Sequence, residues 1–374
     1  MKCDFLFLSW IPKIGNFWII AQKEIEALEE HKFLNKKLIK NNFFVWIDYI
    51  FFILNKLWIL KDRFYYMDRL FSKIANIILK KSEANILHCW SFHCYEILKN
   101  NNYKLTIVER ANASINFSYN VLKDEYKKVW LSFNVSSKHR NIVNKELKLS
   151  KYLLTCSNFA KKTYINEWFP EEKIKVLYYW VDTKQFKMKK SYFKDEKINF
   201  IFVGYDWIRK GLYYLIEARK ELNKEKKFFK NKARLLIFGP NKDDLILKKL
   251  IGDTTNIKLM GKEYPVKIYE YWDVFVFPSL EDWFWLVVLE AMSSWLPVIV
   301  SQNTWASELV EDNGFIIPIK NKISLKEKIE FFVDNPHMII KMGKKSRKIA
   351  EKYTRDNFKL KYINLLNELY NYER

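Results

Sequence analysis

The feature that most constrains this chain is an alternation of short apolar runs with longer segments of helical periodicity. Helical patterns follow the runs at, for example, Leu212–Leu222 and Leu286–Ser293. Short strands that alternate with helices are typical of the α/β class, in which helices cover parallel sheets. The apolar runs of strand type are Phe5–Leu8, Leu105–Val108, Tyr152–Cys156, Ile198–Val203, Leu235–Phe238, Val274–Phe277 and Val298–Val300.

The alternation forms two series, one before about residue 180 and one after about 197. The stretch 183–197 between them is charged and aperiodic, which indicates a linker. We therefore predict Rossmann-like domains at 1–182 and 198–357. A chain of 374 residues with 49% hydrophobic content can build two cores. The last segment, 341–374, has an amphipathic helical pattern that is broken near Thr354.

The charge of the chain is strongly positive, with 65 Lys and Arg against 43 Asp and Glu and a net charge of +22. Such a charge favours anionic partners: nucleotide phosphates, nucleic acid or an anionic membrane face. The lysines are scattered, however, which favours a bias in coding over a dedicated basic surface. Phe43–Leu54 is interrupted by Asp48 and is too short to span a bilayer.

The cysteines and the N-terminus favour a cytoplasmic protein. Four scattered cysteines do not form a disulfide framework, so we expect them to be reduced. The N-terminus shows no signal-peptide cleavage site. No Ser/His/Asp triad, phosphate-binding loop of the P-loop type or His/Cys metal set is visible, so hydrolase, NTPase and metalloenzyme functions lack support.

The most informative motif follows an apolar run: the chain from Val274 reads VFVFPSLEDWFWLVVLEAMSSWLPVIV. Its pattern is strand, loop, helix, strand. Asp282 at the strand's carboxyl edge can accept hydrogen bonds from sugar hydroxyls, and Glu290, eight residues later, can bind a ribose diol. The helix N-terminus between them offers N–H groups to a diphosphate. Ligands of open α/β sheets bind at this edge.

This run resembles the E-x7-E region of the family 4 (group 1) glycosyltransferases, retaining enzymes with a GT-B fold. That region typically reads E-G-F-G-L-x-x-x-E-A-M-A-x-G-x-P-V-I, and Asp282 and Glu290 stand at its two acidic positions. Phe202–Gly204 and Arg209–Gly211 resemble the family's donor-phosphate element, with Tyr205 where many members have arginine. Lys262 and Glu263 fall in the base-contacting turn. Further matches are VERANASINFSYNVLKDEY, TCSNFAK and EEKIKVLYYWVDTKQF.

The resemblance implies two Rossmann-like domains whose parallel sheets face across a cleft, with a final helix at about 358–374 returning to the N-terminal domain. It implies transfer of a sugar, with retention, from a UDP-, GDP- or ADP-sugar to a glycan or lipid-linked acceptor in cell-envelope polysaccharide synthesis. It implies no required metal or cofactor and no nucleic-acid partner, and it allows peripheral contact with an anionic membrane.

The resemblance also assigns residues. Asp282 and Arg110 are the predicted catalytic residues, and His88 is a candidate for the cleft. Arg209 and Lys210 are expected to neutralise the departing diphosphate. The predicted donor-binding residues are Gly204, Arg209, Lys210, Glu263, Phe284, Leu286, Glu290, Gly15 and Asn16. Competing interpretations are a structural His88, an ion pair of Arg110 with Glu109, and a plain strand–helix turn at Gly15 and Asn16.

Tryptophan stands where the family has glycine. The chain has 14 Trp and only 8 Gly, whereas about 7% Gly is ordinary. We hypothesise that a codon read as glycine by the native organism is translated here as tryptophan. If the tryptophans are genuine, a sugar-nucleotide-binding protein without turnover is the alternative, and a nucleic-acid binder is a third. The positions concerned are Trp130, Trp168, Trp180, Trp283, Trp285, Trp295, Trp305 and, with less support, Trp18.

Overall fold

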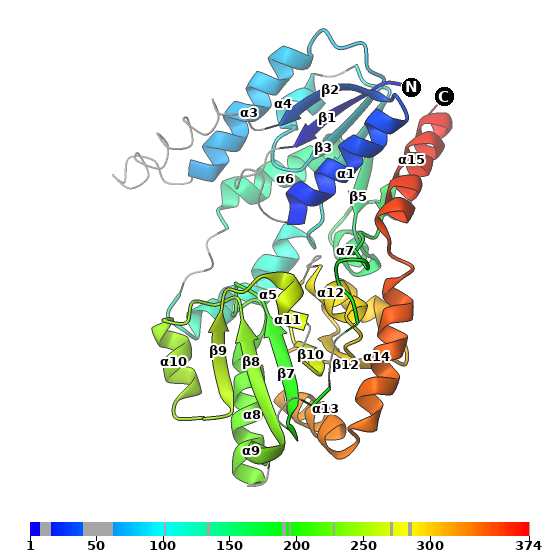
Figure 1. Cartoon of the computed structure of the whole chain (residues 1–374). Helices are drawn as coiled ribbons and strands as arrows, with labels where there is room; N and C mark the ends of the chain where they lie inside the picture. Colours follow the sequence, from blue (N-terminus) through cyan, green and yellow to red (C-terminus); the bar gives the residue numbers. More distant parts are fainter. Residues whose placement is uncertain are drawn as a thin grey trace. The chain divides into compact units, whose positions relative to one another are not determined.

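The computed structural model forms two compact units, each described here by itself (Figure 1). It describes residues 1–7, 16–39, 63–100, 102–131, 133, 135–188, 192–193, 196–226, 229–269, 272–282 and 286–373. The first unit comprises Met1–Asn116, Asn134–Tyr178 and Asp356–Arg374, and the second comprises Phe117–Phe133 and Tyr179–Arg355. None of the described helices has the length and apolarity needed to cross a membrane.

The first unit contains a six-stranded parallel sheet in the order β2-β1-β3-β4-β5-β6. Every residue of β1, β3 and β4 is buried, as expected for central strands covered on both faces. The strands are β1 (Cys3–Phe7), β2 (Leu34–Ile39), β3 (Ile86–Trp90), β4 (Leu105–Glu109), β5 (Tyr152–Thr155) and β6 (Ile174–Val176). The helices are α1 (Asn16–Glu30), α3 (Arg63–Leu79), α4 (Tyr95–Lys99), α6 (Ser137–Leu149), α7 (Asn158–Ile165), the 3-10 helix η1 (Glu171–Lys173) and α15 (Arg355–Tyr372).

The second unit contains another six-stranded parallel sheet, in the order β12-β11-β10-β7-β8-β9. Its strands are β7 (Ile198–Val203), β8 (Ala233–Phe238), β9 (Ile257–Gly261), β10 (Val274–Phe277), β11 (Val298–Ser301) and β12 (Gly314–Ile317). Its helices are α5 (Ile115–Lys127, whose first two residues fall in the first unit), α8 (Leu212–Glu225), α9 (Phe229–Lys232), α10 (Leu245–Ile251), α11 (Pro265–Tyr269), α12 (Val287–Ser293), the 3-10 helix η3 (Trp305–Leu309), α13 (Lys322–Asp334) and α14 (His337–Ala350).

The order of the second sheet reverses between β7 and β10. From β7 the chain proceeds outward through β8 and β9, and from β10 it proceeds the other way through β11 and β12. The segments that follow β7 and β10 therefore leave the same sheet edge in diverging directions. Such a switch point is where open α/β sheets bind ligands. In Figure 1 the arrowheads of β7 and β8 point to the end of the unit at which α11 and α12 lie.

The predicted fold class is confirmed: both units are α/β with parallel sheets, and each of the seven predicted runs overlaps a strand. The predicted helix at 341–374 is divided into α14 and α15 by a short break that contains Thr354. All four cysteines are buried and free. The predictions on Phe43–Leu54 and Gly15 lie outside the described residues.

The predicted domain limits place one segment in the wrong unit, and the predicted linker packs on the second unit. Residues 117–133 lie in the second unit, where Tyr126 donates a 2.6 Å hydrogen bond to Asp206. The beginning of the predicted linker also packs on this unit, because the guanidinium of Arg347 donates hydrogen bonds to the carbonyls of Thr183 and Phe186. Side-chain contacts of this kind are not visible in sequence periodicity.

Two helices of the second unit end in the same hydrogen-bonded turn. At the end of α12, Trp295 N–H donates to Met292 O at 3.1 Å and Leu296 N–H donates to Ala291 O at 3.0 Å. After α5, Trp130 N–H donates to Lys127 O and the next N–H donates to Tyr126 O, both at 3.0 Å. This pattern is the Schellman motif, which places its C′ residue in the left-handed region and favours glycine there.

The residues at these C′ positions are tryptophans. Trp130 has φ +56° and Trp295 has φ +67°. Trp168, Trp180 and Trp305, three further tryptophans of the hypothesised set, are not among the described residues with positive φ. Two positions thus have the backbone that glycine prefers. The hypothesis that they are glycine in the native protein remains a hypothesis.

Candidate active site

The candidate site is built where the loops after β7 and β10 meet. Leu280 N–H and the Ser279 hydroxyl both donate to the carbonyl of Arg209, at 2.9 and 3.1 Å. Gly211 follows with φ +67°, and a Cβ there would lie 2.1 Å from the Pro278 carbonyl oxygen. Only glycine permits both this backbone and this close approach. The two loops are therefore held together by their main chains.

The centre of the site is an ion pair between Lys210 and Asp282. Both side chains are completely buried, and the Lys210 ammonium donates to Asp282 Oδ1. Burial and, next, the charge of Arg209 lower the pKa of Lys210 to about 8, although the Asp282 carboxylate opposes this shift. The second oxygen, Asp282 Oδ2, is buried and has no hydrogen-bond partner among the described residues. A buried acceptor of this kind is free to bind a hydroxyl.

Arg209 and Glu281 extend this centre. The Arg209 guanidinium lies 3.4 Å from Asp206 and 3.9 Å from Glu281. Glu281 is completely buried, accepts a 3.0 Å hydrogen bond from the Ser118 hydroxyl, and has a pKa raised by burial. Glu281 was not predicted from the sequence, although it directly precedes Asp282. Two cationic and three acidic side chains thus meet at the switch point.

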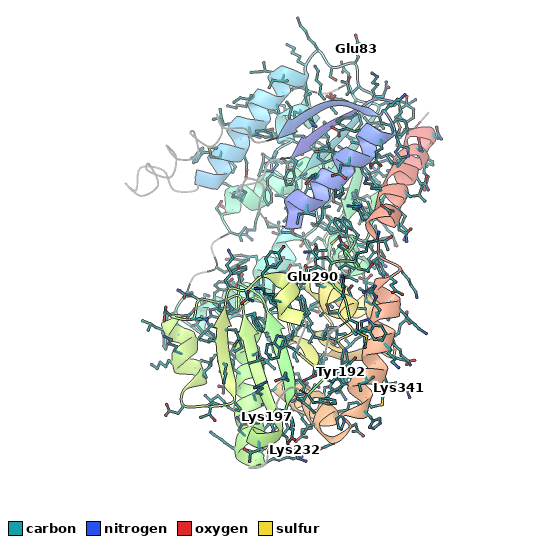
Figure 2. The ribbon with its side chains drawn as sticks, in the orientation of Figure 1. Glu83, Tyr192, Lys197, Lys232, Glu290 and Lys341 are labelled. Carbon is teal, nitrogen blue, oxygen red and sulfur yellow. The ribbon has the colours of Figure 1, made fainter. Side chains whose placement is uncertain are left out.

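Glu290 lies on α12, in the same unit (Figure 2). It accepts a 3.0 Å hydrogen bond from the Tyr269 hydroxyl of α11. Burial raises the pKa of Glu290 to about 7, and the bond from Tyr269 opposes this shift. Leu286 is the N-cap residue of α12 and is buried. Tyr269 was not identified from the sequence, because nothing in its local pattern marks it as a partner of Glu290.

A hollow of about 500 Å³ lies at the carboxyl ends of β7, β8 and β9. The backbones of Gly204 and Gly239 approach closely here, since a Cβ on Gly239 would lie 2.6 Å from the Gly204 carbonyl oxygen. The predicted contact Glu263 is exposed beside the hollow, and its carboxylate accepts from the N–H of the next residue at 2.8 Å. The lining residues are Tyr205, Gly239, Pro240, Asn241, Lys242, Asp243, Gly261 and Lys262.

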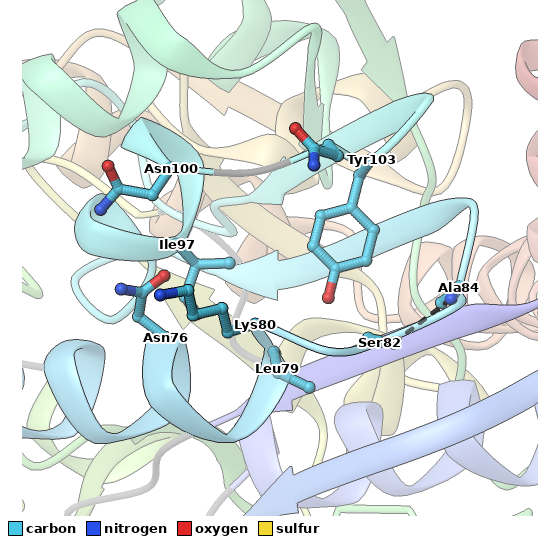
Figure 3. A pocket seen from close by; sticks show the side chains of 9 residues that line it. Asn76, Leu79, Lys80, Ser82, Ala84, Ile97, Asn100 and Tyr103 are labelled. Atoms are coloured by element: carbon cyan, nitrogen blue, oxygen red, sulfur yellow. Dashed lines mark hydrogen bonds between the residues drawn. The ribbon is translucent and has the colours of Figure 1, made fainter.

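A second hollow, of about 70 Å³, lies in the first unit (Figure 3). Lys80, Asn100 and Tyr103 line it, and all three lie outside the carboxyl ends of the strands. The Tyr103 hydroxyl donates to Asp4 at 2.6 Å. This hollow is too small for a nucleotide sugar and lies at the amino ends of β3 and β4, so we do not assign the site to it.

The first unit contains the remaining predicted residues. His88 is the middle residue of β3 and is completely buried, whereas the sequence placed it at a strand edge facing a cleft. Arg110 directly follows β4; it donates to the Ser91 hydroxyl at 2.9 Å and lies 4.9 Å from the centre of the Phe92 ring. Asn16 begins α1, but its side chain lies outside the described residues, as do Gly15 and Phe284.

Comparison with known proteins finds a family match in the second unit, which contains the candidate site. Residues 183–354 match the model of the family described as glycosyl transferases group 1. An uncharacterized glycosyltransferase of Methanocaldococcus jannaschii is 29% identical over 220 residues, which are 52% of this chain and 54% of that protein. The chain spans about half the length of the curated relatives it matches.

Solved structures resemble the whole chain. Sucrose-phosphate synthase of Thermosynechococcus elongatus has a TM-score of 0.72 and 14% identity, covering 99% of both chains. HepE of Anabaena in complex with UDP-glucose has a TM-score of 0.67 and 14% identity, covering 98% of this chain and 99% of that one. At such identities the likeness establishes the fold alone. The chain therefore has the GT-B fold, and its residues 183–354 carry the sequence pattern of the group 1 glycosyltransferases.

Proposed function

We propose that this protein is a glycosyltransferase that moves a sugar from a nucleotide-sugar donor to a glycan or lipid-linked acceptor, with retention of configuration at the sugar. The observation that carries the proposal is the cluster of Arg209, Lys210 and Asp282 at the switch point of the second sheet. The match of this region to the group 1 family and the fold shared with a protein solved with UDP-glucose support it.

The donor's charge and hydroxyls suit this cluster. The diphosphate is placed against Arg209 and Lys210, because two cations stabilise the negative charge that develops on the departing diphosphate. Asp282 Oδ2, which has no hydrogen-bond partner among the described residues, accepts from a hydroxyl of the transferred sugar. Glu290 accepts from the ribose diol, and the nucleobase occupies the hollow beside Gly261 and Lys262.

Lys210 then changes its partner during the reaction cycle. In the described unit its ammonium is paired with Asp282. A bound diphosphate adds negative charge near an amine whose pKa is about 8, so donor binding stabilises the protonated amine. In the transfer step the bond from the sugar's anomeric carbon to the diphosphate oxygen breaks. A bond from that carbon to an acceptor hydroxyl oxygen forms, and the hydroxyl proton passes to the departing diphosphate oxygen, which leaves as part of the nucleoside diphosphate.

The proposal also covers the acceptor and the cellular location of the reaction. Synthesis of cell-envelope polysaccharide at the cytoplasmic side of the membrane fits the net charge of +22, which favours peripheral contact with anionic lipid.

The test is a screen of UDP-, GDP- and ADP-sugars by thermal shift and by release of the nucleoside diphosphate. It uses the chain as written and a version with glycine at Trp283 and Trp285. We expect one donor class to stabilise the protein and to be turned over by the glycine version. Lys210→Met should abolish both effects, whereas the control Lys220→Met, a partly exposed α8 residue paired with Glu217, should preserve them.

The outcomes separate the alternatives. Stabilisation without turnover in both versions would favour a sugar-nucleotide-binding protein. If no sugar nucleotide binds to either version and the protein binds nucleic acid with a steep salt dependence, the basic charge is the functional feature instead. That last result would overturn the glycosyltransferase proposal.

A further inference from the structure

A second cluster of reactive side chains lies in the core of the first unit, away from the residues assigned to the donor. Glu24 of α1, His88 of β3 and Glu109 at the end of β4 come together there. One ligand atom from each lies within 4.8 Å of the others. His88 Nε2 is 2.9 Å from a carboxylate oxygen of Glu109. All three side chains are at most 1% exposed.

The charges of this cluster are not balanced by its own members. The cluster places two carboxyl groups beside one imidazole in the core, and buried carboxylates are costly unless a cation or a proton compensates them. Glu24 Oε1 is buried and has no hydrogen-bond partner among the described residues. The unpartnered Glu24 oxygen therefore offers a position for a cation.

Two neighbouring side chains, Tyr362 and Trp90, contact His88 and Glu24 and fix their orientation. The Tyr362 hydroxyl of α15 lies 2.5 Å from His88 Nδ1 and leaves Nε2 to face the carboxylates. The Trp90 indole donates to Glu24 Oε2 at 3.2 Å and leaves Oε1 as the free oxygen. Second contacts of this kind, on the far nitrogen of a histidine and the far oxygen of a carboxylate, are typical of metal ligands in proteins.

We propose that Glu24, His88 and Glu109 bind one divalent transition-metal ion, of the zinc or manganese type. One imidazole and two carboxylates suit these ions, and a charge of +2 neutralises the cluster. Zn²⁺ bonds to such ligands are about 2.0–2.2 Å long, so atoms that share the ion lie within roughly 4.4 Å of each other. The present separations require only a small movement of one carboxylate. The ion has a structural role, joining α1 to β3 and β4.

The competing interpretation is a proton on Glu24, shared with Glu109. The two interpretations predict different properties for the variant Glu24→Gln. A neutral amide reproduces a protonated acid, so this variant would be as stable as the parent if a proton balances the charge. If a metal ion balances the charge, the variant lacks one ligand of the ion and therefore does not retain it. Both the proposal and its test are independent of glycosyl transfer.

The experiment measures metal content in the full chain. Because the cluster is buried, the protein is unfolded, refolded with ZnCl2 or MnCl2, passed through a desalting column and analysed by elemental mass spectrometry. We expect about one ion per chain for the parent and at least a tenfold lower content for Glu24→Gln. Trp90→Phe should retain the ligands but bind the ion roughly 10–100-fold more weakly.

Glu146→Gln is the matched control. Glu146 is equally buried in the same unit, but its carboxylate accepts from the backbone N–H groups of Phe92, Cys94 and Tyr95. It should retain the ion. If it does not fold, as judged by circular dichroism, the half-buried Glu96→Gln takes its place. A metal content below a tenth of an ion in the refolded parent, or equal contents in the parent and Glu24→Gln, would overturn the proposal.

Discussion

Replacing Trp130 with glycine is expected to stabilise the second unit. Trp130 occupies the C′ position after α5 with φ +56°, and its side chain is 92% exposed. A left-handed backbone costs an L-residue roughly 1–2 kcal/mol. Glycine removes this cost but adds about 0.4–1 kcal/mol of conformational entropy to the unfolded chain. Since almost no packing is lost, the expected gain is about 0.5–1 kcal/mol.

The matched variant is Trp130→Ala, which removes the indole but keeps the Cβ that causes the strain. The assay is equilibrium unfolding in urea followed by far-ultraviolet circular dichroism, so that loss of tryptophan fluorescence does not affect the signal. We expect Trp130→Gly to exceed Trp130→Ala in free energy of unfolding by about 1 kcal/mol. A gain near the lower limit corresponds to a rise in Tm of only about 1–2 °C for a unit of this size.

Trp295 provides a repeat of the test at the end of α12. Its side chain is half-buried, so each truncation also loses packing. The difference between Trp295→Gly and Trp295→Ala cancels that loss and should again be about 1 kcal/mol. An alanine variant as stable as the glycine variant at both positions would refute the argument from backbone strain. Peptide mass spectrometry of the native protein tests the separate hypothesis that glycine is the natural residue.

Three further predictions concern the candidate site. Asp282→Asn leaves Lys210 buried without its partner and should lower the free energy of unfolding by about 3 kcal/mol at pH 6.5. This loss should be smaller at pH 9.5, because the Lys210 amine has a pKa of about 8 and is neutral there in the folded state. Glu290 has a pKa of about 7 in the folded protein against an ordinary value of 4.5, so the parent loses stability as the pH rises from 4.5 to 7. Glu290→Gln does not titrate. Its free energy of unfolding, measured in urea titrations, should therefore rise by up to about 3 kcal/mol relative to that of the parent over this range. Gly211→Ala should lower the free energy of unfolding by more than about 2 kcal/mol, because its Cβ would meet a carbonyl oxygen at 2.1 Å. Gly252→Ala, with φ +60° and no atom within 4 Å of the new Cβ, should lower it by only about 1 kcal/mol. Equal losses of stability in thermal denaturation would contradict this reasoning.

Local sequence patterns do not reveal a site whose three ligands come from distant segments of the chain. Glu24, His88 and Glu109 are far apart in the chain, and each belongs to a different element. The spacing of His and Cys residues gave no metal motif, because a ligand set of this kind is created by the pairing of β3 with β4 and the packing of α1. His88 was likewise expected at a strand edge, although the strand continues two residues beyond it.

Some properties follow from the sequence because they depend on local order. The alternation of apolar runs with helical periodicity determines parallel α/β units, and the strand–loop–helix motif places Asp282 after the carboxyl end of a strand and Glu290 in the helix that follows. The tertiary structure decides what these residues contact: the pairing of β7 with β10 brings Lys210 to Asp282, and the packing of α11 brings Tyr269 to Glu290. Burial and neighbouring charges set their pKa values, and both arise only when distant segments exclude water together.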